Sequence, residues 1–119
     1  MISLPTDEFD QLVEQAISTI PRKYRKYLKN IVVVVEQEPR ERGLLGLYQS
    51  HPPFPDKITI YQGPHQRMAN QQKDLFTAVQ ETVIHEIGHA LGMNESQVLK
   101  MERARRARFR KYTDAKMKQ

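Results

Sequence analysis

The segment from Gln71 to Leu91 constrains the fold more than any other part of the chain. Apolar residues recur along it at three- and four-residue intervals, which predicts one long helix. Gly92 follows directly, and we expect it to end the helix because glycine adopts the positive φ of a C-terminal cap without steric cost. The helix contains the sequence HEIGH, in which two histidines lie four residues apart.

Both histidines lie away from the apolar side of this helix. Successive side chains rotate by about 100° around a helix axis, which places His85 and His89 nearly opposite the apolar stripe and beside small and polar residues. A histidine that belongs to the core would lie on the apolar side instead. The arrangement therefore favours the floor of a cleft. The stripe consists of Phe76, Val79, Val83, Ile87 and Ala90.

The spacing of the histidines and of two nearby glutamates is typical of a metal centre. Two imidazoles at positions i and i+4 can converge on one ion. Glu86 follows His85 and can act as a general base without binding the metal. Glu95 comes six residues after His89, beyond the turn at Gly92, and is expected as a third ligand. Three protein ligands and one open position are the usual pattern of catalytic zinc. The alternative is an ordinary helix stop at Gly92 and an ordinary helix N-terminal acid at Glu95.

Length and composition limit the class of protein. A chain of 119 residues is expected to form one domain, residues 1–119. There are no cysteines, so the metal ligands must be histidine, carboxylate or backbone oxygen, and a reducing cytoplasm is the expected location. No apolar run approaches the roughly 20 residues that cross a bilayer, and the N-terminus does not resemble a signal peptide. We therefore expect no membrane partner.

The positive charge lies at the C-terminus. The chain carries +5, but residues 97–119 hold nine Lys and Arg against two acids, so this tail is +7 and the remainder −2. A last helix is expected from about Gln97 to Tyr112, capped by Ser96 or Asn94. We favour a solvated basic face for the tail over binding to nucleic acid or an acidic partner. One side of this helix would consist of Val98, Met101, Arg105, Phe109 and Tyr112.

Two further helices are expected before the first strand. Apolar residues at helical spacing between Phe9 and Ile20 predict an amphipathic helix, which begins near the acids that follow Thr6. Pro21 separates it from a short basic helix, Arg22 to Lys29. We expect Tyr24, Tyr27 and Leu28 to turn inward from this second helix.

Three segments are expected to form strands. Ile31 to Val35 is a continuous β-branched run, which predicts an interior strand buried on both faces. Leu44 to Gln49 predicts a second strand, weakened or bulged at Gly46. Lys57 to Gln62 alternates apolar and polar residues, which predicts a half-exposed strand at or near the sheet edge.

The stretch TVIHEIGHALGMNE, together with LLGLYQ and KITIYQGP, resembles the bacterial minimal zincin-like metallopeptidases over about Ile31 to Leu99. The resemblance implies a compact α+β domain in which a small mixed sheet packs on the HExxH helix, with flanking N- and C-terminal helices. It also implies that His85, His89 and Glu95 bind the metal and that Glu86 is the catalytic acid. The family often has Asp at the third ligand position, so Glu95 is a variant with a longer reach.

These observations favour a zinc metallopeptidase that binds one Zn²⁺ per chain and hydrolyses a peptide or protein substrate, alone or with a partner. The substrate would lie extended along the edge strand before the active-site helix, expected at Lys57 to Gln62. Candidates for stabilising the oxyanion are Tyr61, Tyr48 and His65. If Glu95 is not a ligand, Glu102 or His65 would be the next choice.

Two functions from other classes remain open. One is a metal-dependent nuclease, which the basic tail favours. Glu86 and Glu95 argue against it, because bacterial rRNA-maturation endoribonucleases have the pattern HxxxHxxxxxH, with no glutamate after the first histidine. The other is a non-catalytic metal-binding or interaction module.

Overall fold

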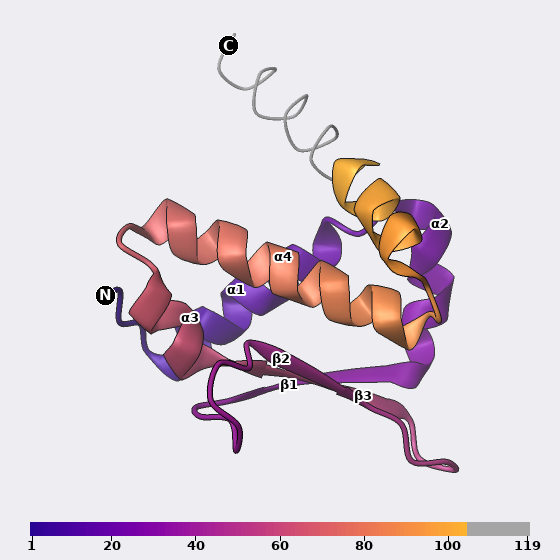
Figure 1. The fold of residues 1–119 in the computed structure, drawn as a ribbon, viewed down its shortest axis with the longest axis horizontal. Helices are drawn as coiled ribbons and strands as arrows, with labels where there is room; N and C mark the ends of the chain where they lie inside the picture. The colour runs from indigo at the N-terminus through magenta and orange to yellow at the C-terminus, as the bar shows by residue number, and fades with distance from the viewer. Residues whose placement is uncertain (105–119) are drawn as a thin grey trace, which may run out of the picture.

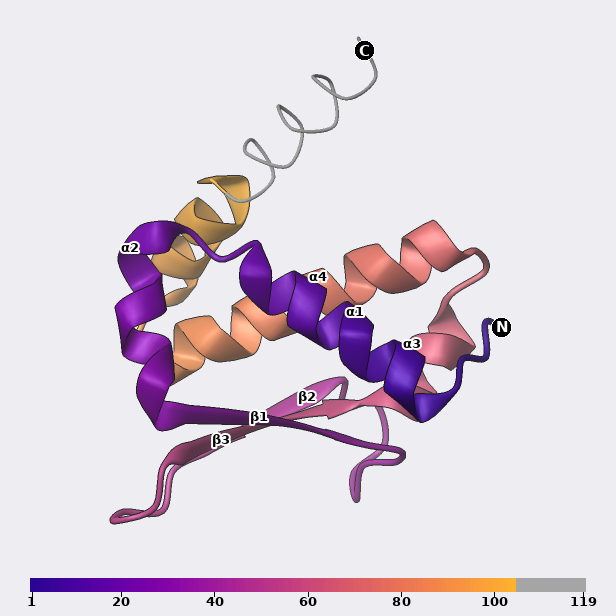
Figure 2. The same cartoon turned by 180° about the vertical axis from the view of Figure 1, so that it is seen from behind.

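The computed structural model describes residues 1–104. A three-stranded sheet forms one layer of this part of the chain, and the described helices lie on one side of it (Figures 1 and 2). The α+β fold class that we expected is therefore confirmed. A further helix begins at residue 95 and continues to residue 104. The other elements are α1 (Thr6–Ser18), α2 (Arg22–Arg25), η1 (Lys26–Asn30), β1 (Ile31–Glu36), β2 (Gly46–Gln49), β3 (Asp56–Tyr61), α3 (Gln62–Met68) and α4 (Gln72–Ala90).

The sheet is mixed, in the order β1-β3-β2. β1 pairs with β3 in parallel, from Ile31 opposite Asp56 to Glu36 opposite Tyr61. β2 pairs with β3 antiparallel, from Gly46 opposite Ile60 to Gln49 opposite Lys57. β1 and β2 are therefore the two edges of the sheet that residues 1–104 form.

This strand order corrects two of our sequence-based expectations. The run Ile31 to Val35 forms an edge strand, in which Val32 is 46% exposed, and not an interior strand. The segment expected at an edge forms the central strand β3, whose residues Ile58 to Tyr61 are all buried. In an all-apolar run the side chains on the two faces of the strand are alike, so the sequence does not show which of them are exposed. Thr59 and Tyr61 are residue types that suggest exposure to solvent, but both are buried on the face of the sheet opposite the helices.

The core lies between the sheet and the pair of helices α1 and α4. Phe9 and Ala16 of α1 meet the fully buried side chains of Val79 and Val83 on α4, and Ile58 and Ile60 contribute from β3. Full burial of a side chain such as Ile or Phe stabilises the fold by about 1.5–3 kcal/mol. This packing fixes the long helix α4 against the sheet, with β2 on the side that faces the viewer in Figure 1.

The short helix α3 was not expected, because QGPHQRM has no apolar periodicity. Pro64 is compatible with its first turn, where the missing N–H would have no helical partner. The buried amides of Gln62 and Gln66 hold the N-terminal segment. Gln62 Nε2 donates to the Leu4 carbonyl at 2.9 Å, and the Leu4 N–H donates to Gln66 Oε1 at 2.8 Å.

Three of the remaining expectations concern the basic segments and the membrane. Tyr24 and Leu28 pack on the core as expected. Tyr27 is 51% exposed, so our expectation that it turns inward was wrong. Val98 and Met101 are buried as expected. Arg105, Phe109 and Tyr112 lie outside the described residues. Within residues 1–104, no helix is long and apolar enough to cross a membrane.

Candidate metal centre

The last turns of α4 carry the two histidines. Val83 and Ile87 are fully buried, whereas His85 is half-buried and His89 is exposed. The two imidazole rings lie 4.6 Å apart between centroids, and their Nε2 atoms are 2.9 Å apart. The rotation of side chains around the helix therefore places both rings on its solvent-facing side, as the sequence predicts.

A sharp turn returns the chain toward these rings. Gly92 has φ +74°, the value expected for a glycine cap. The Met93 N–H donates to the Gly88 carbonyl at 2.9 Å and the Gly92 N–H to the His89 carbonyl at 3.0 Å, which together form a Schellman motif. The helix from residue 95 thus begins directly after the turn and carries Glu95 in its first position.

Asn94 fixes the start of that helix. Its Oδ1 accepts from the Gln97 N–H at 2.9 Å, and its own N–H donates to Gln97 Oε1 at 2.9 Å. This reciprocal pair is a capping box in which asparagine and glutamine satisfy two N-terminal donors. Of the two capping residues that we considered, the structure uses Asn94, and the helix begins two residues earlier than expected.

The three expected ligands lie together. Glu95 Oε1 is 3.9 Å from His89 Nε2, and one ligand atom from each of His85, His89 and Glu95 lies within 4.8 Å of the others. In a tetrahedral zinc site with bonds of about 2.0–2.1 Å, ligand atoms lie about 3.3 Å apart. The histidine pair is slightly closer than this, and Glu95 is slightly farther. Its side chain is 71% exposed and can close the difference by rotating, so the donor set fits zinc.

Glu86 lies between this ligand group and strand β2. Burial raises the pKa of its carboxyl, while the nearby imidazoles of His89 and His85 act in the opposite direction. A Cβ atom added to Gly46 of β2 would lie 3.0 Å from Glu86 Cγ and 2.8 Å from Thr82 Cγ2. The backbone of β2 therefore packs directly on the helix turn that carries Glu86. From the sequence we expected only a strand weakened or bulged at Gly46, and this contact with α4 was not expected.

Replacing Gly46 by alanine should lower the free energy of unfolding by about 1–3 kcal/mol, because the added methyl group overpacks the contact with Thr82 and Glu86. Urea unfolding of the variant measures the loss. Gln49→Ala on the same strand is the control, because Gln49 lies on the opposite face of the sheet from Gly46. A Gly46→Ala variant as stable as the wild type would show that β2 and α4 are not in close contact in solution.

Two of the three oxyanion candidates are not available to a substrate. Tyr61 lies on the face of β3 opposite the core residues Ile58 and Ile60, and is buried there. His65 is also buried, with Nδ1 2.6 Å from the Tyr61 carbonyl oxygen and Nε2 2.9 Å from Thr82 Oγ1. These contacts occupy both ring nitrogens and exclude His65 as an alternative metal ligand as well.

Tyr48 is the remaining candidate. It lies two residues after Gly46 on β2, so both residues are on the face of the sheet that meets α4. Its phenol donates a hydrogen bond to Asp56 Oδ2 at 2.9 Å. This bond raises the pKa of Tyr48, and the phenol therefore keeps its proton at neutral pH.

Burial of His65 predicts a pH-dependent stability. Desolvation lowers its pKa below the ordinary value of 6.5, despite the hydrogen bond to the Tyr61 carbonyl. Below about pH 6.5 the unfolded chain takes up a proton that the folded chain does not, so stability falls as the pH drops toward the folded pKa. The free energy of unfolding should therefore decrease between pH 7 and pH 5 by more in the wild type than in His65→Gln. Equal slopes in the two proteins would contradict a neutral, buried His65.

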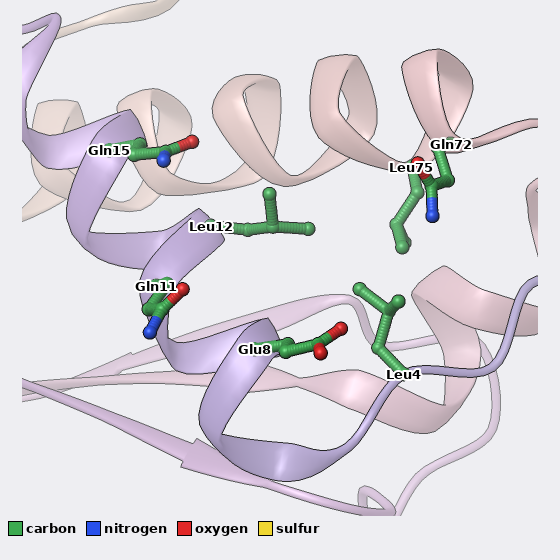
Figure 3. Close-up of a pocket in the computed structure, with 7 residues that line it drawn as sticks. All are labelled: Leu4, Glu8, Gln11, Leu12, Gln15, Gln72 and Leu75. Carbon is green, nitrogen blue, oxygen red and sulfur yellow. The ribbon is translucent and has the colours of Figure 1, made fainter.

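One cavity of the structure lies away from the metal centre. It has a volume of about 270 Å³ and is bounded by the N-terminal segment, α1 and the start of α4. Figure 3 shows Leu4, Leu12 and Leu75 pointing toward one another in this cavity. Glu8 is the only ionisable residue among those that line it. The cavity therefore lacks the paired groups that hydrolysis needs, and the group formed by His85, His89 and Glu95 remains the candidate site.

Known proteins that are similar to this chain include a protein family and a solved structure. The sequence matches the family described as zincin-like metallopeptidase over residues 28–105, a range that contains all three expected ligands and Glu86. A solved structure, a conserved hypothetical protein from Thermo thermophilus, is similar at 28% identity with a TM-score of 0.56. The similarity covers 74% of this chain and 94% of that chain. No curated protein matches the sequence.

Proposed function

The chain belongs to the family of zincin-like metallopeptidases, and we propose that it is a zinc-dependent peptidase in which His85, His89 and Glu95 hold the metal. The observation that carries this proposal is the convergence of these three ligands beside Glu86 and the open edge strand β2. When bound, zinc supplies an activated water and polarises the carbonyl of the scissile bond.

Glu86 is the proton carrier of the proposed reaction. Its carboxylate takes a proton from the attacking water and passes it to the nitrogen of the leaving amine, which is general base and then general acid catalysis. Glu86 is partly buried, which keeps its carboxylate beside the ligand group. It lies on the side of α4 that faces the backbone of Gly46 on β2. The phenol of Tyr48 lies on the same face of β2, and its one proton is donated to Asp56 Oδ2. In this proposal Tyr48 stabilises the oxyanion by exchanging Asp56 for the oxyanion as its hydrogen-bond acceptor when the substrate binds.

The substrate strand is assigned to a different edge than the sequence indicated. The Tyr61 N–H donates to the Leu45 carbonyl at 3.0 Å, so Leu45 and Tyr61 form a hydrogen-bonded antiparallel pair. Along an antiparallel ladder, hydrogen-bonded pairs alternate with pairs that are not hydrogen-bonded. The backbone N–H and C=O groups of Gly46 and Tyr48 consequently point away from β3, toward the free edge of β2. An extended peptide that pairs with this edge would lie next to Glu86.

Hydrolysis by the zinc-loaded full chain tests the proposal. We expect an unfolded protein substrate to yield new N-termini, detected by mass spectrometry. A peptide cleaved in this assay should resist cleavage when its backbone nitrogens facing β2 are methylated, because N-methylation removes the donors that pair with the edge. Zinc-loaded protein that leaves a broad peptide mixture intact would favour the non-catalytic metal-binding module. Equal cleavage of the methylated peptide would contradict β2 as the substrate edge.

A further inference from the structure

The second edge of the sheet, β1, is open on the side away from β3. No strand within residues 1–104 pairs with that side, and Figure 2 shows β1 along the border of the sheet with no other strand outside it. β1 and β2 are opposite edges, so this surface is separate from the proposed substrate strand.

The direction of the free backbone groups of β1 follows from one hydrogen bond. The Gly63 N–H donates to the Gln37 carbonyl at 2.9 Å, directly after the six parallel pairs of β1 and β3. In a parallel ladder the N–H and C=O of one residue point to the same side, and this side alternates along the strand. Because Gln37 points toward β3, Val32, Val34 and Glu36 present their N–H and C=O groups to the open side.

The apolar run Ile31 to Val35 of β1 has no feature that protects this edge, and the one charged residue of the strand, Glu36, stands at its end. Protected edge strands usually contain proline, an inward-pointing or lysine charge, or a bulge. The five residues Ile31 to Val35 contain none of these, and their register with β3 is uninterrupted. Val32 is 46% exposed. The strand therefore offers both unpaired backbone groups and apolar side chains to another strand.

We propose that β1 pairs with β1 of a second copy of this chain, antiparallel about a two-fold axis. Charge favours this partner and this direction. The segment before β1, Arg22 to Lys29, holds five Lys and Arg and no acid, whereas residues 36–42 hold three glutamates and two arginines, and Glu38 already pairs with Arg67. An antiparallel two-fold pair places each basic end beside the weakly acidic end of the other copy, and a parallel pair would place the two basic ends together.

The open backbone groups also select a register. In an antiparallel pair, outward-pointing residues of one strand must lie opposite outward-pointing residues of the other. Val32 opposite Val34 of the second copy satisfies this condition, with Val33 opposite itself on the two-fold axis. In this register each residue from Ile31 to Val35 meets an apolar partner, and Asn30 lies opposite Glu36. The result is a continuous six-stranded sheet with β2 still free at each end.

Sedimentation of the full chain over a range of concentrations tests the pairing. We expect a reversible dimer whose dissociation constant rises at least tenfold in Val34→Lys, while its circular dichroism stays that of the wild type. Glu36→Lys and Lys29→Glu should each weaken the dimer, and the two changes combined should restore it. A chain that sediments as a monomer at about 100 μM, or a dimer that none of these changes weakens, would overturn the proposal.

Cysteine cross-linking tests the register without depending on a destabilising change. The chain has no cysteine of its own. Val33→Cys should form a disulfide-linked dimer on mild oxidation, because facing Cβ atoms of a non-hydrogen-bonded pair are about 4.5–5.5 Å apart. Val35→Cys on the same face of the strand is the matched control, since two such residues would be about 13 Å apart along the strands. Equal cross-linking at both positions would contradict the proposed register.

Discussion

Replacing Glu86 by glutamine should lower kcat for peptide hydrolysis by about 10²–10⁴, the usual contribution of a positioned general base. Glutamine has nearly the same shape and cannot take up the proton, so the packing against Gly46 should persist. The zinc content should also stay at the wild-type value, because Glu86 is proposed as a proton carrier and not as a ligand. Kinetics of the purified variant, together with elemental analysis of the same sample, give both results.

The matched control for this variant is Asp74→Asn. It also converts a carboxylate to an amide on the same helix, at an exposed position in the first turn of α4, twelve residues before Glu86. We expect its kcat to stay within about twofold of the wild type, in keeping with the small effects of changes away from a reacting centre. Cleavage at the wild-type rate by Glu86→Gln would contradict the assigned role, and loss of zinc in that variant would indicate that Glu86 is a ligand.

Removing His89 should weaken zinc binding by more than about 100-fold. The reason is that loss of a residue that only orients a ligand already costs 10–100-fold in affinity, and His89 supplies a ligand atom itself. Competition with a chelator at fixed pH measures the affinity of His89→Ala. The same measurement on Glu95→Ala should show a smaller loss, because the Glu95 side chain is exposed and lies farther from the histidine pair than the histidines lie from each other.

His51→Ala is the control for the histidine change. His51 is exposed and lies in the loop between β2 and β3, outside the ligand group. Its removal should leave the zinc affinity unchanged. If Glu95→Ala also binds zinc as tightly as the wild type, Glu102 becomes the next third ligand to test, because His65 is buried and both of its ring nitrogens have partners.

The long helices α1 and α4 could be predicted, unlike the short α3, because their signals are local. The apolar spacing along α4 and the glycine that ends it are properties of neighbouring residues, and both appear in the structure as expected. The order of the strands depends on contacts between distant segments. We expected an interior strand at Ile31 to Val35 and an edge strand at Lys57 to Gln62, and the structure has the reverse. The exposure of a strand depends on which loops and strands cover it, and residue type alone does not show this.

In the candidate site, too, the features set by neighbouring residues could be predicted, and those set by distant segments could not. The spacing of His85, His89 and Glu95 follows from helix geometry and one turn, and it could be read directly from the sequence. The contact between Gly46 and Glu86 joins residues 40 positions apart, and no local sequence pattern predicts it. The choice among Tyr48, Tyr61 and His65 likewise required the sheet, because only the structure shows which face each side chain occupies.

The proposed metal centre is tested by a crystal structure of the full chain grown with zinc and measured at the zinc absorption edge. We predict one anomalous peak per chain, about 2.0–2.2 Å from His85 Nε2, His89 Nε2 and a Glu95 carboxylate oxygen. Glu86 should lie beside this peak without binding it. The absence of a peak beside the three residues, or a peak that Glu86 coordinates, would contradict the proposed metal centre.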